Sequence, residues 1–163
     1  MAASNNVVRE GISAGLIGAL AIALWFAIID VAQGKIFATP IMLGTSLGSI
    51  FFGGVPPSAA GAFIGYTLFH FVIFAIIGIV LSWVINASER TPSAFIGFAG
   101  LFVAFEVGWI GWTTVLSQGF GQISWLQVFG ANLIGAAAMG WCMWRQHPSL
   151  GRRVSRVVAG QPE

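Results

Sequence analysis

Two ionisable residues lie deep within hydrophobic stretches of this sequence and are the first candidates for chemistry. His70 falls within the stretch 59–85, and Glu106 falls within the stretch 94–116. A charged side chain at the centre of a membrane-spanning helix costs roughly 2.5–3.5 kcal/mol on insertion scales, so such residues usually face a partner or a cavity. An imidazole and a carboxylate can hydrogen-bond to each other or carry a proton. These two positions therefore lead the search for a functional site.

Two further polar residues could complete a hydrogen-bonded network around this pair. With the middle of each stretch taken as the bilayer centre and a rise of about 1.5 Å per residue, His70, Glu106 and Asn132 all lie within roughly 5 Å of the midplane, and Asp30 lies about 12 Å toward the outside. Tyr66 precedes His70 by one helical turn and so shares its face. The sequence thus predicts a midplane network in which His70, Glu106, Asn132 and Tyr66 satisfy one another.

Three uses of these residues stay open: a structural network, an axial tetrapyrrole ligand at His70, and a proton or cation site at Glu106. Other chemistry has little support. The sequence contains two histidines and one cysteine, too few for an ordinary zinc or di-iron centre, and it contains no phosphate-binding loop or nucleophile elbow. We therefore expect no metal site, no catalytic residues and no enzymatic activity. The cofactors left open are a tetrapyrrole and a bound lipid or quinone.

The composition identifies the class of protein that must position these residues. Of the 163 residues, 57% are hydrophobic and 7% are charged, too little polar surface for a soluble domain of this length. A bilayer core about 30 Å thick requires about 20 apolar residues per helix, and four segments have that length: 11–32, 59–85, 94–116 and 125–144. The sequence predicts an all-α polytopic membrane protein, with a four-transmembrane-helix bundle in residues 1–144 and a basic tail in residues 145–163.

The connection between the first two segments, residues 33–57, is unusually apolar for a loop. Thr39 and Pro40 together have the pattern of a helix cap, and a short helix could follow, interrupted by Gly44 and Gly48. About 12 residues are too few to cross a membrane, so we predict a short interfacial helix between the first two spans. It could be a lid over the bundle, a re-entrant segment lining a pore, or a contact surface for another subunit.

The basic residues predict the orientation. In a four-span topology six of them share one side, leaving Lys35 alone on the other; the six are Arg9, Arg90, Arg145, Arg152, Arg153 and Arg156. The positive-inside rule then places both termini in the cytoplasm of a bacterial inner membrane. In the tail, the arginines at 145, 152, 153 and 156 lie beside an apolar helical face and are suited to anionic lipid headgroups. The excess positive charge follows from topology, so we expect no nucleic-acid partner.

Small residues recur at a spacing of four along the predicted helices. This spacing places two gaps on one helix face and lets two backbones approach closely. Whether the neighbouring helix belongs to the same chain or to another is left open by the pattern. The glycines predicted to pack helices are Gly11, Gly15, Gly18, Gly61, Gly65, Gly135 and Gly140.

One set of residues resembles a signature of small four-helix bacterial inner-membrane proteins of unassigned function. It consists of Ala23-Leu24-Trp25-Phe26, then Asp30 and Gly34, then Thr39-Pro40 and Leu43-Gly44, and so covers about the first third of the chain. Some small polytopic proteins of this sort are similar to accessory subunits of larger assemblies, including photosynthetic reaction centre and antenna complexes.

The function expected from these observations is a non-catalytic accessory or scaffolding subunit of a larger membrane complex. Its partners would be membrane lipids and other membrane protein subunits. Two alternatives stay open. One is a small oligomeric transporter or channel that uses Glu106 and His70. The other is a pigment- or haem-binding membrane protein that uses His70 as the ligand.

Overall fold

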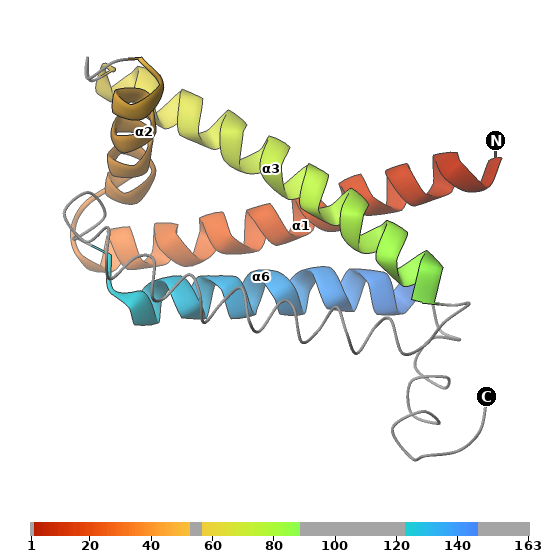
Figure 1. Cartoon of the computed structure of the whole chain (residues 1–163). Helices are drawn as coiled ribbons and strands as arrows, with labels where there is room; N and C mark the ends of the chain where they lie inside the picture. Colours follow the sequence, from red (N-terminus) through yellow and green to blue (C-terminus); the bar gives the residue numbers. More distant parts are fainter. Residues whose placement is uncertain (1, 53–56, 89–122, 147–163) are drawn as a thin grey trace.

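The computed structural model describes residues 2–52, 57–88 and 123–146, and their regular secondary structure is entirely α-helical. The helices are α1 (Ala2–Ala32), α2 (Ala38–Phe51), α3 (Ala59–Ser88) and α6 (Trp125–Gln146) (Figure 1). Three of them, α1, α3 and α6, are long and apolar enough to cross a membrane. The prediction of an all-α membrane protein is therefore confirmed.

Some predicted features lie outside the described residues. These are the third span, 94–116, with Glu106, and the arginines at 90, 152, 153 and 156. The number of four spans therefore stays a prediction. The three described spans agree with the sequence prediction at most of their ends, although α1 begins at Ala2 rather than near residue 11.

Side chains at the first turns explain where α3 and α6 begin. Ser58 caps α3, because its Oγ accepts a hydrogen bond from the Gly61 N–H at 3.2 Å. At the start of α6, the Ser124 N–H donates to Gln127 Oε1 at 3.2 Å and the Leu126 N–H donates to Ser124 Oγ at 3.3 Å. Ser124 and Gln127 thus cap the start of α6 reciprocally, in the manner of a capping box.

Helix α1 is the centre of the described structure, since it packs against both α3 and α6 (Figure 1). Its contact with α3 is made by backbone against backbone. A Cβ atom on Gly15 would overlap the carbonyl oxygen of Phe74, and one on Gly78 would overlap that of Gly11. Glycine is required at this crossing because any side chain would force the two helices apart.

Where α1 packs against α6, a large side chain of one helix lies over a glycine of the other. The Met139 side chain covers Gly18, and the Ile22 side chain covers Gly135. Near the start of α6, the Trp25 indole N–H donates to the Gln127 carbonyl at 3.0 Å. This hydrogen bond fixes the end of α1 to the first turn of α6.

The predicted packing glycines therefore divide into two groups. Gly11, Gly15, Gly18 and Gly135 are buried against neighbouring helices of the same chain. Gly61, Gly65 and Gly140 are exposed, and a Cβ on Gly65 or Gly140 would meet no atom of the described residues within 4 Å. Identical spacing in the sequence thus has two different outcomes, and only the first group packs within the described part of the chain.

Helix α2 runs from the end of α1 to the start of α3 and lies transverse to α1 (Figure 1). It rests on the first turns of α3 through its two buried glycines. A Cβ on Gly44 would overlap the carbonyl of Ala62, and a Cβ on Gly48 would lie 2.8 Å from the Pro57 ring. The expectation that Gly44 and Gly48 interrupt this helix is wrong, because they form its contact face. The short apolar helix predicted between the first two spans is therefore present, and its location at the membrane interface stays a prediction.

Candidate functional site

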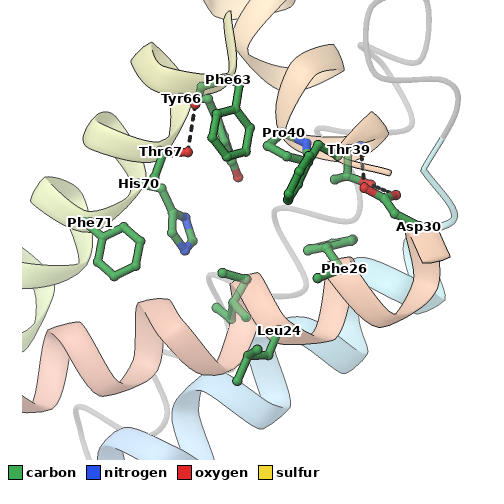
Figure 2. Close-up of a pocket in the computed structure, with 14 residues that line it drawn as sticks. Leu24, Phe26, Asp30, Thr39, Pro40, Phe63, Tyr66, Thr67, His70 and Phe71 are labelled. Atoms are coloured by element: carbon green, nitrogen blue, oxygen red, sulfur yellow. Dashed lines mark hydrogen bonds between the residues drawn. The ribbon is translucent and has the colours of Figure 1, made fainter. Parts of the chain in front are cut away.

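A cavity of about 220 Å³ lies between α1, α2 and α3 (Figure 2). It exists because α1 and α3 touch at their glycines and then separate toward α2, where large side chains replace the small ones. Phe26, Phe37, Phe63 and Phe71 contribute aromatic walls. The polar lining residues are Asp30, Thr39, Tyr66, Thr67 and His70.

His70 lies on the wall that α3 contributes, and it is 8% exposed. Its Nε2 is 3.1 Å from the carbonyl oxygen of Ala19 on α1. A carbonyl can only accept, so Nε2 carries the proton, and in a neutral imidazole Nδ1 is then an acceptor. Because a metal ligand must be an unprotonated nitrogen, tetrapyrrole ligation through Nε2 would require this hydrogen bond to break.

Tyr66 and His70 share one face of α3, as the sequence predicts. Their rings are stacked, with centroids 5.7 Å apart and an interplanar angle of 25°. The ring of Phe74 flanks His70 on the other side, at 4.7 Å between centroids. Asn132 lies on α6 and is not among the residues that line the cavity. Glu106 lies outside the described residues, so the His70–Glu106 hydrogen bond stays a prediction.

The end of α1 turns the chain toward α2. The Gly34 N–H donates to the Val31 carbonyl at 3.0 Å, and the Lys35 N–H donates to the Asp30 carbonyl at 2.8 Å. This pair of bonds is the Schellman motif, which requires a left-handed residue just after the helix. Gly34 fills that position with φ of +69°, which glycine adopts without steric cost.

Asp30 uses its side chain to cap α2. Its Oδ2 accepts the Thr39 N–H at 2.8 Å, and its Oδ1 accepts the Thr39 hydroxyl at 2.6 Å (Figure 2). Asp30 is 3% exposed. Its negative charge lies at the amino end of α2, where the helix dipole favours it.

The expectation that Thr39 and Pro40 themselves cap this helix is wrong. The N-cap is Phe37, which has φ of 60° and makes no side-chain capping bond. Thr39 is the second residue of α2, and Pro40 has no N–H to satisfy. The Thr39 N–H thus needs an acceptor from elsewhere, and the carboxylate of α1 supplies it.

Sequence reasoning did not place Asp30 in the site. Its estimated depth separated it from the midplane residues, yet the cavity extends from His70 to Asp30. The available signal was an acidic residue one turn before the end of an apolar span, followed by a glycine and a threonine-proline pair.

The described residues contain no group of three or more His, Cys, Asp or Glu side chains that could hold a metal ion. Comparison of the chain with protein-family models, with curated proteins and with solved structures found no match.

Proposed function

We propose that this chain is a membrane-embedded binding protein that takes a small lipid-soluble molecule into the cavity between α1, α2 and α3. The supporting observation is the cavity itself, which combines aromatic walls with polar groups from three helices. Its volume of about 220 Å³ is below the ~300–1,000 Å³ of typical ligand sites. It suits a small molecule or the ring portion of a larger one. The membrane would be a bacterial inner membrane, with both termini cytoplasmic.

A variant that fills the cavity tests this proposal. Ala27 lines the cavity on α1, whereas Ala137 on α6 is exposed, so Ala27→Phe and Ala137→Phe form a matched pair. The full chain would be reconstituted in lipid nanodiscs and melted with a panel of small neutral, cationic and anionic aromatic compounds. A ligand that binds the folded state raises its melting temperature.

We expect at least one compound to raise the melting temperature of the wild type and of Ala137→Phe, but not that of Ala27→Phe. The proposal is wrong if no compound has an effect, or if the compounds stabilise Ala27→Phe as much as the wild type.

An accessory or scaffolding role in a larger membrane complex, photosynthetic or otherwise, is a second proposal. It is favoured by the exposed Gly65 and Gly140, which leave flat surfaces where another transmembrane helix could approach. Gentle solubilisation followed by identification of co-purifying subunits tests it. Gly140→Leu should release such a partner while leaving the melting temperature of the isolated protein unchanged. Purification of the wild type without any partner would contradict this role.

A further inference from the structure

We infer that the cavity selects organic cations, with an ammonium group near the Asp30 carboxylate and its substituents against the aromatic walls. This inference rests on the proposed binding function and adds the charge and chemical class of the ligand. Three observations carry it: the charge of the lining, the arrangement of the rings, and the position of Asp30 between the cavity and a second hollow.

The charge of the lining is negative. Among the described residues that line the cavity, Asp30 is the one carboxylate, and there is no lysine or arginine. Both carboxylate oxygens of Asp30 act as acceptors, Oδ1 for the Thr39 hydroxyl at 2.6 Å and Oδ2 for the Thr39 N–H at 2.8 Å. Thr39 orients this charge without neutralising it. A buried carboxylate is stabilised by an opposite charge, which a bound ammonium would supply and a bound anion would not.

The rings form walls of the kind that bind ammonium groups. Phe37 and Phe63 meet with centroids 4.9 Å apart at an angle of 55°, so their faces are inclined to each other. Phe26, Tyr66 and Phe71 line the same space (Figure 2). A cation over an aromatic face gains about 0.5–1 kcal/mol at exposed sites and about 2 kcal/mol or more when desolvated.

A second hollow provides a route to the carboxylate from the end where α2 lies. Asp30 and Thr39 line this hollow as well as the cavity, so the pair separates the two spaces. The other residues of the hollow include Gln33, Lys35 and Gln127, and it is therefore the more polar of the two. Asp30 therefore borders both the polar hollow and the aromatic cavity.

The test compares a cation with its neutral isostere. Benzyltrimethylammonium and neopentylbenzene have nearly the same shape and differ by one charge. Their dissociation constants would be measured for the full chain in nanodiscs by saturation-transfer NMR. We expect the wild type to bind the cation at least about tenfold more tightly, which corresponds to about 1.4 kcal/mol.

Two variants locate the source of this preference. Asp30→Asn keeps the shape of the side chain and removes its charge, so it should bring the ratio of the two dissociation constants close to one. Phe63→Leu should weaken binding of the cation severalfold. Its control is Phe69→Leu on the same helix, because Phe69 is 43% exposed and does not line the cavity.

The outcomes separate this inference from the proposed function. Equal affinity of the wild type for the two probes overturns cation selection, and the cavity remains a binding site for neutral molecules. Binding of neither probe, together with no effect of any compound in the panel, overturns both. The comparison in the wild type does not depend on whether Asp30→Asn folds.

Discussion

Thr39 donates two hydrogen bonds to the Asp30 carboxylate, one from its backbone and one from its hydroxyl. The backbone carbonyl of Asp30 meanwhile accepts the Lys35 N–H that closes the end of α1. One residue therefore terminates α1 and starts α2. Asp30 therefore connects the position of α2 to the end of α1.

The hydroxyl bond can be removed separately from the backbone bond. Thr39→Val keeps the N–H donor and the side-chain shape but leaves a buried carboxylate oxygen without a partner. We expect it to lower the free energy of unfolding by about 1–3 kcal/mol. Thr39→Ser retains a hydroxyl and should lower it by less than half as much. Unfolding of both variants in a mixed detergent system measures the difference, and equal losses would contradict the role of the hydroxyl.

The crossing of α1 and α3 should tolerate no side chain. Gly15→Ala places a methyl group against the backbone of α3, and we expect it to lower the free energy of unfolding by about 1–3 kcal/mol. Gly65→Ala adds the same methyl group in open space on α3 and should be neutral or slightly stabilising, since alanine is the better helix former. Comparable losses from the two variants would contradict the backbone contact.

Ser82 on α3 is fully buried at 0% exposure, and its Oγ has no hydrogen-bond partner among the described residues. An unsatisfied buried hydroxyl costs about 1–3 kcal/mol. Ser82→Ala removes this cost and leaves a cavity no larger than one oxygen atom, so it should stabilise the protein by about 1 kcal/mol. Loss of stability on the same scale would reveal a partner outside the described residues.

The indole bond between α1 and α6 predicts a further effect. Trp25→Phe removes the donor to the Gln127 carbonyl and part of the ring that lies against Gly130. We expect the free energy of unfolding to fall by about 1–2 kcal/mol. Trp141→Phe on the exposed face of α6, where Trp141 is 62% exposed, is the matched control and should have little effect. A larger loss of stability from Trp141→Phe than from Trp25→Phe would mean that the smaller ring, and not the missing indole hydrogen bond, causes the effect.

The spans and their caps could be predicted from the sequence because both are local properties. An apolar run of sufficient length forms a helix in a membrane whatever surrounds it, and the pattern at residues 124–127 contains both partners of its capping box. The pairing of Tyr66 with His70 was predictable for the same reason, since residues four apart share a helix face.

The hydrogen-bond partners of the site residues could not be predicted from the sequence, because they depend on which helices pack together. His70 donates to the Ala19 carbonyl, 51 positions away in the sequence, and no side-chain pattern identifies a backbone acceptor. The bond from Thr39 to Asp30 depends on the turn at Gly34, which returns the chain over the end of α1. Gly15 and Gly65 have the same spacing pattern, but only packing shows which one is covered.

The glycine contact between α1 and α3 also makes the cavity sensitive to the membrane around it. Asp30 is fifteen positions after Gly15 and so lies about 22 Å along α1 from it, and a change of about 5° in the crossing angle displaces Asp30 by about 2 Å. A helix whose apolar stretch is longer than the hydrocarbon layer can adapt by tilting. Lipid chain length should therefore change the width of the cavity. We expect the affinity for any bound molecule to vary with the chain length of the lipid.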